Sequence, residues 1–162
     1  MAAPSFQLLT SPQRWIAGIP ANFENVMQAD TRHWQQFMPR LRGIKNRLGG
    51  HLVSASVYQP SENGLFNPFA PVQKWAGVEV ETGEALPEGM HTLLIPAGEY
   101  AVFRYQGLPS GASSFFKAVF SESLPQAGLL IDSRPHFELL PPGYSATDPN
   151  AEEEVWVPVM RM

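Results

Sequence analysis

Hydrophobic and polar residues alternate with a period of two along several short segments, and this pattern predicts β-strands. In "HLVSASVYQ" one face carries small aliphatic side chains, and the other face carries Ser54, Ser56 and Tyr58. In "QKWAGVEVE" the same alternation puts Trp75 and Glu79 on one face. The spacing predicts further strands at 15–19, 92–107, 135–140 and 154–160, with a break near 96–98 where proline and glycine interrupt the pattern.

Two segments instead show apolar residues at helical spacing. The first runs from about 30 to 48, and its apolar positions are Trp34, Phe37, Leu41, Ile44 and Leu48. Asp30 or Thr31 can cap its start, Gly49 and Gly50 follow its end, and Pro39 predicts a kink or break inside it. The second helix is predicted in "SGASSFFKAVFSESLP", with its phenylalanines on the apolar side.

The order of these elements repeats along the chain. Strand, helix, strand, strand occurs over about 5–81 and again over about 90–160, which together predict a single α+β domain of 1–162. Such a duplication predicts antiparallel sheets with the helices on one face. The other face must then be closed in some other way.

Composition narrows the classes of function. The chain of 162 residues is 44% hydrophobic, enough for one core, and its net charge of −4 without a basic run argues against direct nucleic-acid binding. It contains no cysteine, no convincing signal peptide and no apolar run near the roughly 20 residues that span a bilayer. We therefore expect a cytoplasmic protein. The four histidines lack metal-ligand spacing and no nucleotide motif is present, so we expect no metal and no cofactor.

One acid interrupts an apolar strand. In "SRPHFELLPP", Glu138 lies between Phe137 and Leu139. If those two face the helices, Glu138 faces the opposite side together with His136 and Leu140. A buried carboxylate without a partner is costly, so the acid needs either a ligand or an ion pair. The candidates for a structural ion pair are Arg134, Arg104 and Lys74.

Aromatic residues on the non-core phase of their strands suggest walls around this acid. Tyr58, Trp75 and Trp156 share that phase, and aromatic walls around one acid suit flat cations. The two serines of the Tyr58 strand would leave room between the walls. The remaining candidates are Tyr105, whose phase is ambiguous, Glu79 as a second acid, and His136, which lies in the groove or on the surface. The run Glu152–Glu154 is expected to be an exposed approach to the last strand.

The ordered set "WAGVEVE", "IPAGEYAVFRYQG", an aromatic-rich helix, "RPHFELL" and "EEEVWVPV" resembles the GyrI-like effector-binding family. This module also occurs in AraC-type and MerR-type multidrug regulators, and the resemblance runs from about Trp15 to Val159. It implies two modules related by a pseudo-two-fold axis, with a ligand groove on the sheet side away from the helices. By the same resemblance, Glu138 binds cationic, aromatic, lipophilic compounds and Trp156 supplies an aromatic wall. Leu140 stands where the family often has tyrosine.

The expected function is therefore a stand-alone binding protein for small lipophilic, aromatic or cationic molecules, acting in sensing or sequestration. Direct DNA binding is not expected, since only about fourteen residues precede the first predicted strand. Two alternatives remain: a hydrolase of reactive cyclopropane-bearing aromatic compounds that uses Glu138, and a protein-interaction role such as gyrase modulation. The expected ligand-binding residues are Ser54, Ser56, Tyr58, Trp75, Glu79, Tyr105, His136, Glu138 and Trp156.

Overall fold

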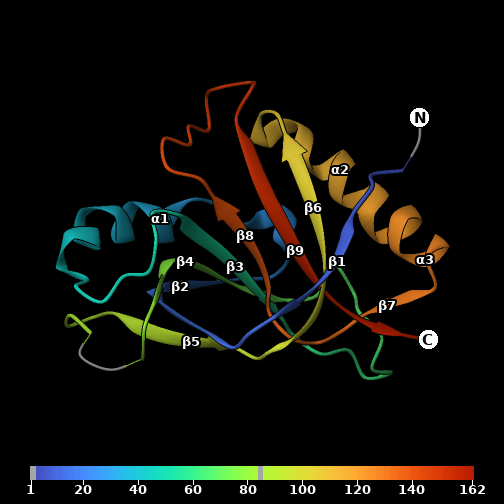
Figure 1. Ribbon diagram of the computed structural model, residues 1–162, viewed down its shortest axis with the longest axis horizontal. Helices are drawn as coiled ribbons and strands as arrows, with labels where there is room; N and C mark the ends of the chain where they lie inside the picture. Colours follow the sequence, from blue (N-terminus) through green and yellow to red (C-terminus); the bar gives the residue numbers. More distant parts are fainter. Residues whose placement is uncertain (1–2, 84–85) are drawn as a thin grey trace.

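A computed structural model describes residues 3–83 and 86–162, which within those ranges form one nine-stranded antiparallel sheet and two helical segments that pack on it (Figure 1). The strands are β1 (Gln7–Ser11), β2 (Arg14–Phe23), β3 (Leu52–Tyr58), β4 (Val72–Val80), β5 (His91–Ile95), β6 (Gly98–Gln106), β7 (Leu129–Ile131), β8 (His136–Leu140) and β9 (Glu152–Arg161). The main helices are α1 (Arg32–Phe37), α2 (Ala112–Ala118) and α3 (Leu124–Gln126), with a π-helical turn at Val119–Ser123 between the last two.

The strand order makes the internal duplication visible. The sheet runs β1-β6-β9-β8-β3-β4-β2-β5, with β7 paired to the end of β9. Read outward from the β8–β3 junction, β8, β9, β6 and β1 correspond to β3, β4, β2 and β5. The predicted strand–helix–strand–strand repeat and the α+β class are therefore confirmed. β1 was not predicted from the sequence. It pairs with β6 and so ties the N-terminal segment to the second half of the sheet.

The two helical segments cover the same face of the sheet. Phe37 of α1 packs on β2 and β4, while Val119 and Leu124 of the second helical segment pack on β6 and β9. Directly paired residues in an antiparallel sheet lie on one face, and registered pairs connect these two clusters across β8 and β3. In Figure 1, α1 and α2–α3 lie toward opposite ends of the sheet, with β8 and β3 between them. Across the described ranges, no helix is both long and apolar enough to cross a bilayer.

The opposite face is also buried, because the sheet curls and brings distant strands together. β2 and β9 are four strand spacings apart in the sheet order, which is about 19 Å in a flat sheet. Nevertheless, the guanidinium of Arg14 on β2 lies 5.1 Å from the ring centroid of Trp156 on β9. The residues buried on this face are Ile16, Val53, Ala55, Trp75, Ile95, Tyr100, Phe137 and Trp156. We expected a ligand groove on the face away from the helices. The buried side chains that fill this face contradict that expectation.

The first helix is shorter than its apolar spacing predicted. The α-helix ends at Phe37 and continues as a 3-10 helix over Met38–Gly43, so the break expected at Pro39 is confirmed. Ile44 is extended and buried, and Leu48 is 42% exposed, so the predicted helical role of these two residues is wrong. At the start, the side chain of Asp30 accepts a hydrogen bond from the backbone N–H of Arg32 at 3.0 Å.

Two glycines permit an unusually close approach of β2 and β4. Gly18 and Gly77 are directly paired across these strands. A Cβ atom on Gly18 would lie 2.2 Å from the carbonyl oxygen of Ala76, and one on Gly77 would lie 2.5 Å from that of Ala17. Both missing side chains would point to the face on which the sheet curls. The absence of Cβ atoms at this pair therefore permits the tight packing of that face.

We expect Gly18→Ala to lower the free energy of unfolding by about 1–3 kcal/mol, because backbone atoms must move to admit the methyl group. Urea denaturation measures the change. Gly43→Ala is the matched control, since its Cβ would meet only side-chain atoms of Pro87, Cγ at 3.4 Å and Cβ at 3.9 Å. Equal losses in the two variants would show that the close approach of β2 and β4 is not needed for the fold.

Candidate functional site

A single row of paired residues crosses the centre of the helix-bearing face. Phe103 pairs with Val155, Val155 with Glu138, Glu138 with Ser54, and Ser54 with Ala76. The first two belong to the apolar cluster beneath α2–α3, and Ala76 belongs to the cluster beneath α1. Glu138 and Ser54 are therefore the polar residues at the boundary between the two clusters.

Glu138 has no ion-pair partner in the part of the chain that the structure describes. None of the ion pairs within 4.0 Å involves its carboxylate. The cations considered as structural partners are engaged elsewhere: Arg134 with Asp132 at 2.7 Å, Arg104 with Glu152 at 3.4 Å, and Lys74 with Ser56 at 2.7 Å. The structural ion-pair alternative for this half-buried acid is therefore not supported.

A second acid adjoins Glu138. Glu153 on β9 is only 8% exposed, which contradicts the expectation that the run Glu152–Glu154 is a solvated approach to the strand. Burial, the negative charge of Glu138 and a hydrogen bond with its side chain raise the pKa of Glu153 to about 9, against a smaller opposing effect of Lys74. A carboxyl group with this pKa keeps its proton at neutral pH. Glu153 can therefore act as a hydrogen-bond donor to the Glu138 carboxylate.

The pKa values of two tyrosines are raised by the charges of the same acids. Burial raises the pKa of Tyr58, and the charge of Glu138 raises it further. The pKa of Tyr144 is raised by burial and then by the charges of Glu153, Glu138 and Tyr105. On β8, Leu140 occupies the position two residues after the acid, where the family often has a tyrosine. The structure instead places phenol groups near the acids from β3 and from the segment between β8 and β9.

A cation lies on the same face of the sheet. Lys74 on β4 is directly paired with Ser56 on β3, and its Nζ donates a hydrogen bond to the Ser56 hydroxyl at 2.7 Å. Ser56 is in turn paired with His136 on β8. Burial, the charge of Lys74 and that of Arg134 lower the pKa of His136 to about 3, so this imidazole is neutral at physiological pH.

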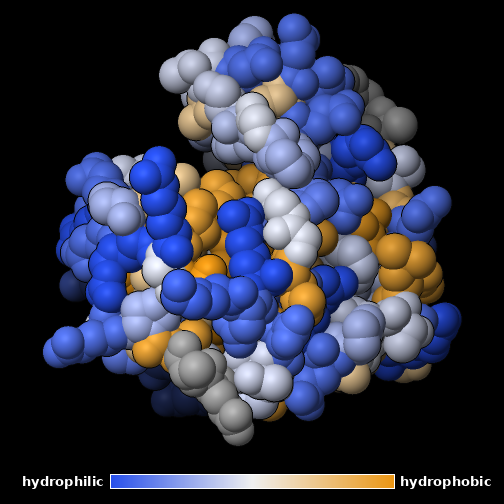
Figure 2. Space-filling view, turned by 60° about the vertical axis from the view of Figure 1, so that its left-hand side comes forward, coloured by the Kyte–Doolittle hydropathy of each residue, from blue (hydrophilic) through white to orange (hydrophobic). Residues whose placement is uncertain are grey.

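An aromatic side chain from a connecting segment covers this end of the site. Phe66, between β3 and β4, stacks on His136 at a centroid distance of 5.0 Å and lies 5.0 Å from the ring of Tyr58. It also lies 5.1 Å from Phe120 of the second helical segment. A cavity of about 190 Å³ adjoins the cluster, lined in part by Tyr58, Phe66, His136 and Arg134. Elsewhere on the molecule, on the left-hand side of Figure 1, which Figure 2 brings forward, apolar surface lies in a hollow between hydrophilic side chains.

Three of the predicted site residues lie on the other face. Trp75 and Trp156 belong to the apolar cluster of the curled side, where Trp156 stacks on Phe137 with centroids 5.2 Å apart. Glu79 forms an ion pair with Arg14 at 2.9 Å on that side. The prediction that Trp75, Trp156 and Glu79 share a groove with Glu138 is therefore wrong. The prediction that Phe137 faces the helices is wrong for the same reason.

The other predicted residues do share the face of Glu138. Ser54, Ser56 and His136 are buried there, and His136 is not a surface residue. Tyr105 is paired with Glu153, which settles its phase. Its ring packs 5.0 Å from that of Phe115 on α2. The structure therefore places Ser54, Ser56, Tyr58, Tyr105, His136 and Glu138 on one face of the sheet.

Sequence reasoning missed Glu153, Lys74, Tyr144 and Phe66 as members of this site. For two of them a signal was present. Glu153 is in phase with Val155 and Val157 of its strand, and Lys74 is in phase with Ala76. Phe66 and Tyr144 lie between strands, where no periodicity predicts the direction of a side chain.

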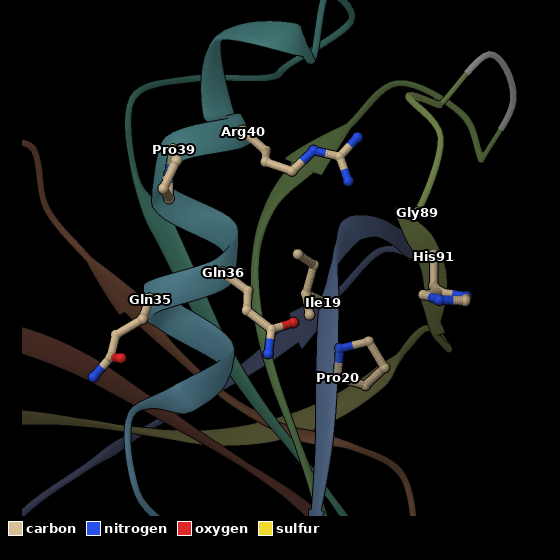
Figure 3. Close-up of a pocket in the computed structure, with 8 residues that line it drawn as sticks. All are labelled: Ile19, Pro20, Gln35, Gln36, Pro39, Arg40, Gly89 and His91. Carbon is tan, nitrogen blue, oxygen red and sulfur yellow. The ribbon is translucent and has the colours of Figure 1, made fainter.

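A larger hollow lies at the edge of the sheet, away from these residues. It has a volume of about 660 Å³ and lies between the first helical segment and the β2–β5 edge (Figure 3). Its lining residues are Ile19, Pro20, Gln35, Gln36, Pro39, Arg40, Gly89 and His91. Among the residues that the structure describes, its lining includes no carboxylate and none of the predicted site residues. We therefore place the candidate site at Glu138.

The buried acid makes the stability of the fold depend on pH. Because folding raises the pKa of Glu153, the native state retains a proton that the unfolded chain loses above about pH 4.5. Its contribution is fully present below that pH and is lost as the pH rises to about 9, by up to about 1.4 kcal/mol per pH unit. We expect Glu153→Gln to be more stable than the wild type at pH 9, with a smaller difference at pH 5.

Urea denaturation at pH 5, 7 and 9 tests this expectation. Glu152→Gln is the control, because its side chain is exposed and should leave the pH dependence unchanged. A wild-type protein and a Glu153→Gln variant with parallel pH profiles would contradict a protonated Glu153.

Comparisons with known proteins support the fold described above. Residues 72–160 match the GyrI-like small molecule binding domain. The transcriptional regulator BrlR of Pseudomonas aeruginosa is 30% identical over 127 residues, which are 78% of this chain but 44% of the regulator, so the chain spans less than half of that relative's length. The structure of SAV2435 bound to tetraphenylphosphonium has a TM-score of 0.73 at 20% identity, covering 96% of this chain and 94% of that one. A Staphylococcus aureus protein has a TM-score of 0.71 at 21% identity, covering 96% and 98%.

The matched family model covers more than half of the chain, from β4 to β9, and includes both acids and Lys74. The chain therefore belongs to the GyrI-like small-molecule-binding domain family.

Proposed function

We propose that this protein binds lipophilic cations at Glu138, on the helix-bearing face between α1 and α2–α3, and that it senses or sequesters them in the cytoplasm. The observation that carries the proposal is a half-buried carboxylate without an ion-pair partner among the described residues, beside a second carboxyl group. A carboxylate in this position attracts a positively charged ligand, with an energy on the order of 3 kcal/mol at about 5–6 Å.

The side chains around the acids suit a ligand with aromatic rings. Tyr58, Phe66 and His136 form a cluster with centroid distances of 4.9 to 5.0 Å, and Phe120 extends it toward the second helical segment. Aromatic faces attract cations and pack against flat rings. SAV2435, whose fold matches that of this chain, was solved with bound tetraphenylphosphonium. This ligand combines one positive charge with four phenyl rings. We therefore choose tetraphenylphosphonium as the first probe.

We expect tetraphenylphosphonium to raise the melting temperature of the wild-type protein and to have little effect on the Glu138→Gln/Glu153→Gln double variant. Both carboxyl groups are replaced because Glu153 can ionise once the charge of Glu138 is removed. Either single variant should bind at least about tenfold more weakly, corresponding to a loss of about 1.4 kcal/mol.

Glu79→Gln is the matched control for this measurement. It also removes a carboxylate from the sheet, but from the opposite face, where Glu79 is paired with Arg14. Its ligand-induced shift should equal that of the wild type, whatever its own melting temperature. If the double variant shifts as much as the wild type, the acid-centred site is wrong.

The pair of acids also favours one alternative, the hydrolysis of reactive aromatic compounds. Glu153 holds a proton beside the Glu138 carboxylate, and a proton donor next to a base is what acid–base catalysis of water attack requires. A cyclopropane-bearing aromatic substrate tests this activity. Product formation that is lost in Glu138→Gln would support hydrolysis, whereas binding without product in the wild type would exclude it for that substrate.

A further inference from the structure

The charged groups of the site nearly balance one another when it is empty. The Glu138 carboxylate and the Lys74 ammonium lie on the same face of the sheet, on β8 and β4. Glu153 is buried on the same face, two residues along β9 from Val155, the residue paired with Glu138, and its raised pKa keeps it protonated at neutral pH. One negative and one positive charge are therefore present. A ligand that brings a further positive charge would leave this half-buried region with a net charge of +1, which burial disfavours.

Among Glu153 and the groups that face it, one can change its charge and so restore that balance. Tyr105 on β6 is paired with Glu153, and Tyr144 lies in the segment between β8 and β9, where burial and then the charge of Glu153 raise the pKa of its phenol. Tyr58 on β3 is held neutral by burial and by Glu138, and His136 on β8 is neutral as well. His33 of α1, which also experiences the charge of Lys74, has its pKa lowered to about 4 by burial and is neutral too. Lys74 donates a hydrogen bond to the Ser56 hydroxyl at 2.7 Å. Glu153 is thus the group that can lose a proton, and its negative charge then balances the positive charge of the ligand.

We propose that Glu138 and Glu153 act as one cation site that holds a proton when empty and exchanges that proton for the positive charge of a ligand. The proposal rests on the proposed function and adds Glu153 as the residue that distinguishes charged from neutral ligands. In the exchange, the O–H bond of Glu153 breaks, the proton passes to solvent, and both carboxylates face the ligand. No bond in the ligand changes.

This exchange has a consequence for specificity. A permanent cation should release about one proton on binding near neutral pH, and its affinity should rise with pH by up to about tenfold per pH unit. A neutral ligand of similar shape should bind without proton release, because the empty site is already balanced. Triphenylphosphine oxide is such a neutral probe, with three phenyl rings and no net charge.

Isothermal titration calorimetry tests the proposal directly. Tetraphenylphosphonium is titrated into the wild-type protein at pH 7 in buffers that differ in their enthalpy of ionisation. The slope of the observed enthalpy against the buffer enthalpy gives the number of protons released. We expect about one proton for tetraphenylphosphonium, about none for triphenylphosphine oxide, and a rise in the affinity of the cation between pH 6 and 8.

Two variants separate this exchange from general electrostatic effects. Glu153→Gln should bind the cation more weakly, release few protons and lose the pH dependence between 6 and 8. Lys74→Met should also release fewer protons, because without the lysine the Glu138 carboxylate alone balances the ligand. Glu152→Gln is the control and should release as many protons as the wild type, since its exposed carboxylate is paired with Arg104.

Each outcome decides the proposal. Binding of tetraphenylphosphonium without proton release, or with the same release in Glu153→Gln, overturns the exchange but leaves the proposed binding function intact. Absence of binding by both probes at millimolar concentration overturns the proposed function and the exchange together. Release of about one proton that disappears in Glu153→Gln supports both.

Discussion

The antiparallel pairing of β3 with β8 is the constraint on which the site depends. Five pairs, from Leu52–Leu140 to Ser56–His136, join the two halves of the sheet, and Ser54 and Glu138 form the central pair. The halves are related about this junction, so Ser54 and Glu138 occupy corresponding positions in the two repeats. A small hydroxyl on one side leaves room for a carboxylate on the other. The duplicated fold thus supplies one acid rather than two at its centre, and β9 supplies the second.

The alternation along each strand was predicted correctly in several places. The prediction of which strand faces lie on the same side of the sheet was wrong. Within β8, Glu138 does share its side with His136 and Leu140, as the period of two requires. The pattern does not fix the register between strands, however, and register decides which faces coincide. Because the curled sheet buries both faces, hydrophobicity no longer marks the side of the helices. Trp75 and Trp156 were therefore placed with Tyr58, although they pack on the opposite face.

The fold could be predicted further than the site. Period and punctuation located most strands, the break at Pro39 and the duplicated order, since these are local properties of the chain. The first helix was overextended because Ile44 and Leu48 continue a helical spacing that the backbone abandons after Phe37. Glu153 was missed because three successive acids suggest solvent, whereas only the middle one is in phase with the buried valines of β9. The raised pKa of Glu153 depends in part on Glu138, which lies fifteen positions earlier in the sequence.

The site divides recognition between two kinds of structure. The charged groups Glu138, Glu153 and Lys74 lie on central strands, whose backbone is fixed by hydrogen bonds on both sides. The rings of Phe66 and Tyr144 come from segments between strands, which can adjust without breaking the sheet. In the proposed exchange, a proton shared by the two carboxyl groups lets these charged groups balance when the site is empty, so that the fold buries no uncompensated charge in the absence of ligand. Under the proposed function, selection for charge can then be strict while selection for shape stays permissive.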